Sequence, residues 1–357
     1  MQVYLSALVF CPTNSIIRGL FRTEQPSWPV KPRVDDNWSP SLQTLEGHDD
    51  NVISVTFSPD ERILASSSED STVKLWDTTT GQCVRTIQTS GPADSVAFST
   101  NGVTLASASN CFIELWNTRT GHCVERLATY GDPQSVAFSS DEVTLASGSD
   151  MKVVQLWDLD SSQCVQTLKG HHACLTSVIF SRDGSLITSA SDDNTVKLWE
   201  TNTGICLKTV CHYSVISVGF PPGGPYVAFA TDAGVEMQNL TTCQHFRLTA
   251  DQLLEEIDTI GISCDGTKFA AGLESGGIYV WDVTTNQSKR MPSGHHGRMM
   301  SIAFAGGGAL FASASTDESI KLWDLTINQP HAPLQLPFAS SASIRFRADN
   351  CRALSMS

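Results

Sequence analysis

The stretch LEGHDDNVISVTFSPDERILASSSEDSTVKLWDTTTGQCVRTI, from Leu45 to Ile87, decides the fold, because most of the chain after it is an imperfect copy. It holds four short segments that indicate strands: the first and fourth alternate apolar and polar residues, and the second and third are rich in residues that favour strands. Turn residues separate the segments, for example Ser58-Pro59-Asp60 and Thr79-Thr80-Gly81. A lone four-stranded sheet would expose two apolar faces, so we expect the copies to pack on one another.

The copies can be counted by the tryptophan that ends the third segment. It recurs at Trp76, Trp116, Trp157, Trp199, Trp281 and Trp323, and Asn239 marks a further copy that has lost it. The successive intervals are 40, 41, 42, 40, 42 and 42 residues. A period of about 40 to 45 residues, with Gly-His near the start and Trp-Asp near the end, is typical of propeller blades. The chain therefore resembles the WD-repeat β-propellers over roughly Ser41 to Leu325.

We predict an all-β fold, a seven-bladed WD-repeat propeller that spans residues 41–325. The segment Ser41 to Leu45 resembles a fourth strand, and pairing with Ser319 to Trp323 would close the ring and remove its open edges. Residues 326–357 form a C-terminal tail that resembles a partial extra repeat, which leaves an eight-bladed alternative open. Residues 1–40 read as an N-terminal extension or linker that contains one short helix.

Charge and composition restrict the function. The net charge of −14 repels phosphate backbones and anionic membranes, which disfavours binding to nucleic acid or membrane. No apolar run approaches the roughly 18 residues of a transmembrane helix. No phosphate-binding glycine motif occurs in a strand-to-helix setting, and the histidines and cysteines lack the spacing of a zinc site. We therefore expect no cofactor, no metal and no small-molecule substrate.

Five of the eleven cysteines occupy equivalent places in successive units, on the predicted outermost strand. Equivalent positions of neighbouring blades diverge at the rim, too far apart for the roughly 5.5 Å that a disulfide requires between its Cα atoms. We expect free thiols in a reducing compartment, which favours the cytoplasm. These residues are Cys83, Cys123, Cys164, Cys206 and Cys243.

Three units hold a His, a Ser, an Asp and a Trp at matching positions. These are His48, Ser66, Asp70 and Trp76 in the first unit, His171, Ser189, Asp193 and Trp199 in the fourth, and His295, Ser313, Asp317 and Trp323 in the seventh. The composition of each set is also that of a catalytic triad. The resemblance instead implies a buried structural chain of hydrogen bonds from Trp to Ser to His to Asp. The other units lack part of the set, so we expect the ring to be softest near its fifth and sixth units.

Function in such a fold concentrates in loops on the rigid ring. The loops before each first strand and between the second and third strands share one face, where we predict contacts with a protein partner. The face carries more acid than base, which favours a basic or mixed partner. The predicted contact residues are Asp50, Asn51, Glu69, His172, Asp192, His296, Arg298 and Thr316. We expect a non-catalytic interaction scaffold; the alternative is a propeller enzyme with a site in the central channel, although we find no clustered acids, bases or metal ligands along the first strands.

A second resemblance concerns the N-terminal segment VYLSALVFCPTNSIIRGLF, the Trp- and Pro-rich stretch after it, and LQTLEGH. Together with repeats of the form DTxTGxC, this segment is similar to the junction before the WD-repeat array in fungal NACHT-type heterokaryon-incompatibility proteins. The resemblance implies a ligand-sensing or autoinhibitory array in a NACHT-type signalling system.

Overall fold

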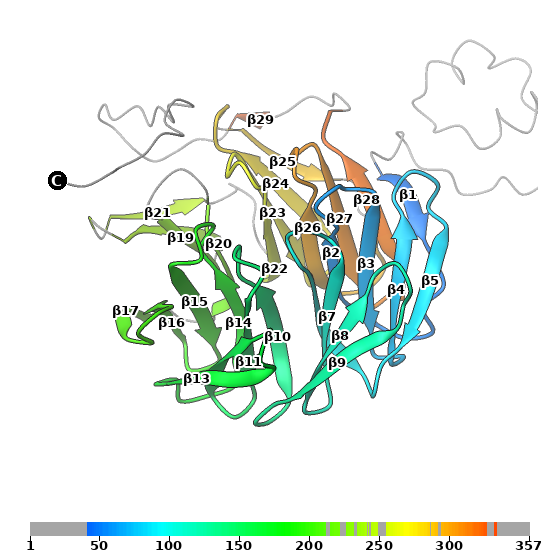
Figure 1. The fold of residues 1–357 in the computed structure, drawn as a ribbon. Coiled ribbons are helices and arrows are strands. Elements are labelled where there is room, and N and C mark those ends of the chain that lie inside the picture. Colours follow the sequence, from blue (N-terminus) through cyan, green and yellow to red (C-terminus); the bar gives the residue numbers. More distant parts are fainter. Residues whose placement is uncertain are drawn as a thin grey trace, which may run out of the picture.

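The computed structural model describes residues 41–211, 215–221, 226–231, 234–240, 242, 244–248, 255–285, 287–291, 294–326 and 332–333. Within these residues every regular element is a β-strand, and the strands form seven antiparallel sheets. Figure 1 shows these sheets in sequence order around the molecule. The predicted helix in residues 1–40 lies outside the described residues, as does the predicted tail except for residues 326, 332 and 333.

Each sheet is one blade, built in most cases from four consecutive strands. Blades 1 to 3 consist of β2 (Val52–Phe57), β3 (Ile63–Ser68), β4 (Thr72–Asp77), β5 (Cys83–Gln88); β6 (Ala93–Phe98), β7 (Thr104–Ser109), β8 (Phe112–Asn117), β9 (Cys123–Ala128); and β10 (Pro133–Phe138), β11 (Thr144–Ser149), β12 (Val153–Asp158), β13 (Gln163–Lys169). Blades 4 and 5 consist of β14 (Leu175–Phe180), β15 (Leu186–Ser191), β16 (Thr195–Glu200), β17 (Cys206–Cys211); and β18 (Val215–Gly219), β19 (Tyr226–Thr231), β20 (Gly234–Asn239), β21 (His245–Leu248). Blades 6 and 7 begin with β22 (Ile257–Ile262), β23 (Lys268–Leu273), β24 (Ile278–Asp282), β25 (Gln287–Met291); and β26 (Met299–Phe304), β27 (Leu310–Ser315), β28 (Ile320–Asp324).

The sequence Asp77-Thr78-Thr79-Thr80-Gly81, at the end of the third strand, fixes the hairpin to the fourth strand. In blade 1 the Oδ1 atom of Asp77 accepts hydrogen bonds from the backbone N–H groups of Thr79 and Thr80, at 3.0 and 2.7 Å. Gly81 closes the turn at a φ of 69°, a left-handed conformation that glycine adopts without steric cost. Asn117 makes the same contacts in blade 2. The turn chemistry read from the sequence therefore sets the hairpin locally.

The ring closes through β1 (Ser41–Leu45), which pairs antiparallel with β28 as the fourth strand of blade 7. Figure 1 shows the two strands side by side. The first strands of the seven blades contact one another in a complete cycle, with β26 of blade 7 against β2 of blade 1. The predicted pairing is confirmed, and the eight-bladed alternative is wrong, because the place of an eighth blade is already filled.

A short strand, β29 (Ala332–Pro333), pairs with β25 and makes blade 6 five-stranded. This segment lies in the predicted extra-repeat tail, and it extends the outer edge of an existing blade.

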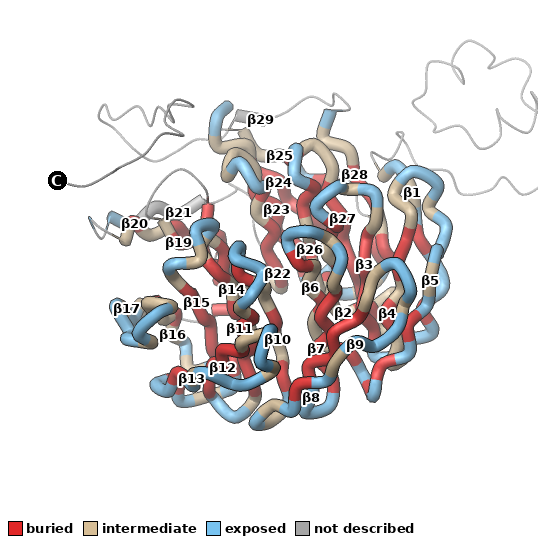
Figure 2. The backbone as a smooth tube through the Cα atoms, viewed as in Figure 1, coloured by how far each residue is buried: buried red, intermediate tan, exposed pale blue. Residues whose placement is uncertain are grey.

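Seven apolar clusters fill the spaces between successive blades. The cluster at the closure joins Leu45 and Ile320 of blade 7 to Val52 and Trp76 of blade 1. Exposed residues collect in the turns and along outermost strands such as β5, β9 and β13 (Figure 2). Each blade thus buries both of its faces against neighbours of its own kind, as the repeat pattern predicts.

The register of blade 5 corrects one detail of the repeat count. Val227 of β19 pairs with Gln238, as Leu64 pairs with Trp76 in blade 1. Gln238 therefore occupies the tryptophan position, and Asn239 occupies the position of Asp77. In agreement with this, Asn239 Oδ1 accepts the N–H of Thr242, as Asp77 accepts that of Thr80. The prediction that Asn239 replaces the tryptophan is wrong by one residue, because the sequence there offers only Gln-Asn for Trp-Asp.

Candidate functional site

The structure brings each predicted set of His, Ser, Asp and Trp together inside one blade. In blade 1 the indole Nε1–H of Trp76 donates to Ser66 Oγ at 2.8 Å, and Ser66 Oγ lies 2.7 Å from His48 Nε2. His48 Nδ1 lies 2.8 Å from Asp70 Oδ2. Since the serine hydroxyl accepts from the indole, it donates to Nε2, and Nδ1–H of the imidazole donates to the carboxylate. The chain of bonds ties the third strand to the second and to the loops at one end of the blade.

Blades 4 and 7 repeat this geometry. The distances from the indole nitrogen to serine Oγ are 2.9 Å for Trp199 and Ser189 and 2.8 Å for Trp323 and Ser313. The imidazole-to-serine distances are 2.7 and 2.8 Å, and the imidazole-to-carboxylate distances are both 3.0 Å. The remaining members of these sets are His171, Asp193, His295 and Asp317.

The protonation of these sets follows from burial and hydrogen bonding. Burial lowers the pKa of His48 and of His171 despite the carboxylate beside each ring, which favours the neutral imidazole. Burial alone would raise the pKa of Asp70, but hydrogen bonds from Thr72, His48 and the backbone of Asp49 lower it to about 2. The pKa of Asp193 is lowered to about 2 in the same way. At neutral pH each of these pairs is an ionised carboxylate that accepts from a neutral imidazole.

A triad composition alone does not provide a nucleophile that can reach a substrate. Ser66 is 0% exposed, and its hydroxyl is already engaged by an indole and an imidazole. Attack on a substrate requires an open space beside the hydroxyl oxygen, together with donors for the developing oxyanion. The sealed set is suited to holding strands together, because a buried indole or imidazole without partners costs about 1 to 3 kcal/mol.

Blades 2 and 3 lack the His and Asp and hold a different polar residue in the same space. The position two residues before the tryptophan is Lys74 in blade 1 and Lys197 in blade 4, but Glu114 in blade 2 and Gln155 in blade 3. Glu114 is fully buried, and its Oε2 accepts from the N–H of Ser90, at 3.1 Å, in the loop before the first strand. Gln155 Oε1 accepts the equivalent N–H, that of Tyr130, at 2.9 Å. The sequence analysis missed these substitutes because they lie on the third strand, whereas the His and Asp that they replace lie in loops.

Blade 6 has no such substitute at its tryptophan. Ala271 stands where the other tryptophans find a serine, and Trp281 Nε1 is buried with no hydrogen-bond partner among the described residues. An unsatisfied buried donor destabilises the fold, so this contact is a weak point of the ring.

The eight predicted contact residues all lie in loops at one end of the blades, here called the upper face, defined by the loops that carry His48 and Asp70. Several already have partners: Asn51 Nδ2 donates to Glu69 Oε2 at 2.9 Å, and Arg298 lies 2.6 Å from Asp258. Asn51 and Thr316 are half-buried, and the other six are exposed: Asp50, Glu69, His172, Asp192, His296 and Arg298.

The ion pair of Arg298 reveals a contrast between two equivalent places on this face. Asp258 and Asp94 are both the bulged residue of a first strand, and Arg298 and Asp132 both immediately precede the first strand of the next blade. Between blades 6 and 7 the guanidinium of Arg298 therefore faces the carboxylate of Asp258. Between blades 2 and 3 the carboxylate of Asp132 takes the place of that guanidinium beside Asp94. Burial, and then the charges of Asp132 and Glu69, raise the pKa of Asp94 to about 6. The sequence analysis found no clustered acids on the first strands, because neighbouring blades contribute them.

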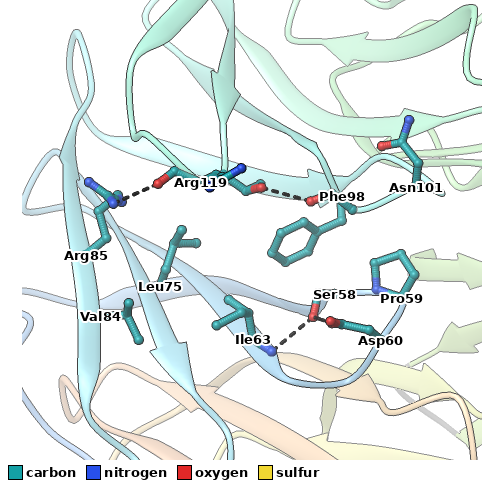
Figure 3. A pocket seen from close by; sticks show the side chains of 12 residues that line it. Ser58, Pro59, Asp60, Ile63, Leu75, Val84, Arg85, Phe98, Asn101 and Arg119 are labelled. Carbon is teal, nitrogen blue, oxygen red and sulfur yellow. Dashed lines mark hydrogen bonds between the residues drawn. The ribbon is translucent and has the colours of Figure 1, made fainter.

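The opposite face holds a pocket of about 550 Å³ between blades 1 and 2 (Figure 3). Ile63, Leu75 and Phe98 form its apolar wall, and the guanidinium of Arg85 donates to the carbonyl oxygens of Arg119 and Thr120, both at 2.9 Å. None of the predicted contact residues lines this pocket.

Within the described residues no group of three or more His, Cys, Asp or Glu side chains is placed to hold a metal ion. The same part of the chain contains no helix of the length and hydropathy that crossing a bilayer requires. The thiols of Cys83, Cys123, Cys164 and Cys206 are free, and Cys243 lies outside the described residues.

Comparison with known proteins locates four segments of the chain, residues 39–77, 81–117, 162–200 and 286–324, that match the WD40 family, described as "WD domain, G-beta repeat". The vegetative incompatibility protein HET-E-1 of Podospora anserina is 48% identical over 82 residues, which are 23% of this chain and 6% of that protein. The nuclear distribution protein nudF 1 of Talaromyces marneffei is 43% identical over 56 residues, 14% of this chain and 12% of its own length. A ribosome biogenesis protein BOP1 homolog of Drosophila virilis is 42% identical over 64 residues, 17% of this chain and 8% of its own. The chain thus spans only a small part of each of these relatives.

Proposed function

We propose that this chain, which is a WD-repeat β-propeller, serves as a non-catalytic protein-interaction module. The observation that carries the proposal is the closed ring, which holds two sets of loops rigidly while it seals its Ser-His-Asp sets inside the blades. Loops on a rigid scaffold are where binding residues concentrate, and WD-repeat propellers typically act as interaction scaffolds. The burial of these sets argues against their use as catalytic triads.

The upper face is the proposed contact surface. Its predicted contact residues include exposed charged and imidazole side chains, such as His172, Asp192 and His296. The acidic net charge favours a partner with basic groups. Arg298 is better regarded as a structural residue, because its guanidinium neutralises Asp258.

The similarity to the vegetative incompatibility protein supports a more specific setting, in which the propeller is the recognition array of a NACHT-type signalling system. The free, exposed thiols support a reducing compartment such as the cytoplasm.

Affinity capture from the source cell tests the proposed interaction. The tagged chain is compared with a variant that carries Asn51→Ala, His172→Ala and His296→Ala on the upper face. The matched control carries Arg119→Ala, Asp160→Ala and Asn202→Ala, which are exposed residues in turns on the opposite face. After equal thermal melts are verified, we expect a specific protein to be captured by the intact chain and the control and lost by the upper-face variant. Loss with the control alone would place the contact on the opposite face and contradict the proposal.

A further inference from the structure

The start of β8 and two loops of blades 2 and 3 expose large apolar side chains on the upper face. Phe112, Tyr130 and Met151, here called the apolar patch, are 36, 62 and 45% exposed. They stand in blades 2 and 3, two of the four blades without a complete set of His, Ser, Asp and Trp, where the loops are held by Glu114 and Gln155.

Backbone contacts join these loops into one surface. The N–H of Thr129 donates to the carbonyl of Cys111 at 2.9 Å, and that of Asp150 donates to the carbonyl of Asp132 at 3.1 Å. Gly131 adopts a φ of 85° and lies against Met151, so closely that a Cβ atom there would be 2.2 Å from Met151 Cγ. Backbone hydrogen bonds therefore hold the segments that carry the patch in place.

Two carboxylates that border the patch, those of Asp94 and Asp132, form no ion pair within the described residues. Cys111, next to Phe112, donates its thiol to Asp132 Oδ1 at 2.8 Å, and Asp132 in turn acts on half-buried Asp94. The charges that act on Asp94 are the carboxylates of Asp132 and Glu69. Lys152 is exposed in the adjoining turn, but it is not among these charges.

The same molecule shows what satisfies such a carboxylate. At the equivalent place between blades 6 and 7, the guanidinium of Arg298 lies 2.6 Å from Asp258, whose side chain is only 6% exposed. Asp132 takes the place of Arg298 between blades 2 and 3, and among the described residues no cation is paired with Asp94 there.

We propose that the upper face of blades 2 and 3 binds a partner polypeptide through an arginine that pairs with Asp94, beside an apolar side chain that packs on Phe112, Tyr130 and Met151. The inference rests on the proposed interaction function and names the part of the face and the chemistry of the partner. Arginine fits because its planar guanidinium pairs with a carboxylate through two hydrogen bonds, and its stem packs along apolar surface.

The probe is an array of short synthetic peptides with glycine at all but two adjacent positions. One position carries Arg, Lys, Gln or Glu, and its neighbour carries Phe, Leu or Gly. We expect Arg beside Phe or Leu to bind best, and replacement of Arg by Gln to weaken binding about tenfold or more, measured by fluorescence polarisation. An array without preference for Arg over Glu overturns the proposal.

Variants of the intact chain locate the site. Asp94→Asn keeps the side-chain shape and is expected to weaken binding of the best peptide about tenfold, as is Tyr130→Ala. Asp132→Arg recreates the pair of Asp258 and Arg298 within the chain, so it should abolish peptide binding while raising the melting temperature. The matched control, Asp132→Ala, removes the carboxylate without filling the place and should bind within about threefold of the intact chain. Undiminished binding by folded Asp132→Arg overturns the proposal.

The two proposals fail in different ways. If a partner is captured from the cell and lost with the upper-face variant, but is bound equally by Asp132→Arg, the interaction module stands and this site is wrong. If no partner is captured while the array selects arginine peptides that Asp132→Arg does not bind, the site stands and the cellular function is wrong.

Discussion

At the scale of single residues, the side chain that a neighbouring blade places beside a buried carboxylate decides whether that carboxylate is paired. Asp94 and Asp258 occupy equivalent bulges, yet only Asp258 has a guanidinium beside it. The pKa of Asp94 is raised to about 6, first by burial and then by Asp132 and Glu69, so its folded state holds a proton more tightly than the unfolded chain does. Stability from that proton is complete below pH about 4 and is lost as the pH rises through about 6.

The sign of this effect gives a testable prediction for Asp94→Asn. The variant has no carboxylate to ionise, so at pH 7.5 we expect its free energy of unfolding to exceed that of the unchanged chain by about 1 kcal/mol, after allowance for screening of a half-buried group. Near pH 4 the difference should vanish. Urea unfolding of both proteins at the two pH values measures it; a variant that is less stable at pH 7.5 would contradict the assignment.

At the scale of elements, five of the seven blades, blades 1 to 4 and blade 7, share a hydrogen bond from the tryptophan of the third strand to a serine of the second. Trp76 of β4 donates to Ser66 of β3, and Trp323 of β28 donates to Ser313 of β27. In blade 6, β23 offers Ala271 instead, which leaves the indole N–H of Trp281 without a partner among the described residues.

Ala271→Ser should therefore stabilise blade 6. A hydroxyl at this position matches the serine of blades 1 to 4 and 7 and is expected to add about 1 kcal/mol by accepting the bond from Trp281. Hydrogen exchange of the β23 and β24 amides, together with the thermal melt, measures the gain. The control Ala270→Ser places a hydroxyl on the neighbouring buried residue, where it should destabilise the blade. Equal effects of the two substitutions would show that the indole does not need the bond.

At the scale of the whole molecule, the five residues of β1 close the ring by pairing with β28, whose residues lie 275 or more positions later in the sequence. Register pairs Leu45 with Ile320 and Ser41 with Trp323. A closed ring removes the exposed edges through which sheets aggregate, so β1 matters more than its length suggests.

Two leucines of β1 test whether its buried side closes the ring, because one is buried and the other is exposed. Leu45 is 2% exposed in the cluster between blades 7 and 1, whereas Leu42 is 54% exposed on the same strand. We expect Leu45→Ala to lower the free energy of unfolding by about 2 to 4 kcal/mol, through the cavity and the weakened closure, and Leu42→Ala to change it by less than about 0.5 kcal/mol. Chemical denaturation of both variants gives the comparison; similar losses would mean that β1 does not close the ring through its buried side.

The sequence by itself determined the all-β class and predicted the partner of β1, because alternation and turn residues are local and each copy repeats them. It left seven and eight blades open, and the pairing of β1 with β28 decided for seven. The spacing marked His48, Ser66 and Asp70 as a set that recurs in three units, and the family resemblance implied the hydrogen bonds that join them. The sequence misplaced the missing tryptophan of blade 5 by one residue, because pairing across strands sets the register there.

Only the tertiary structure decided what lies between blades. Glu114 replaces a histidine by reaching a loop 24 residues away, and Asp94 meets Asp132 and Glu69 from the blades on either side. Such contacts join residues with no common periodicity, so no local pattern records them. Their chemistry depends on burial and on distances between charges, which arise only when the ring has closed.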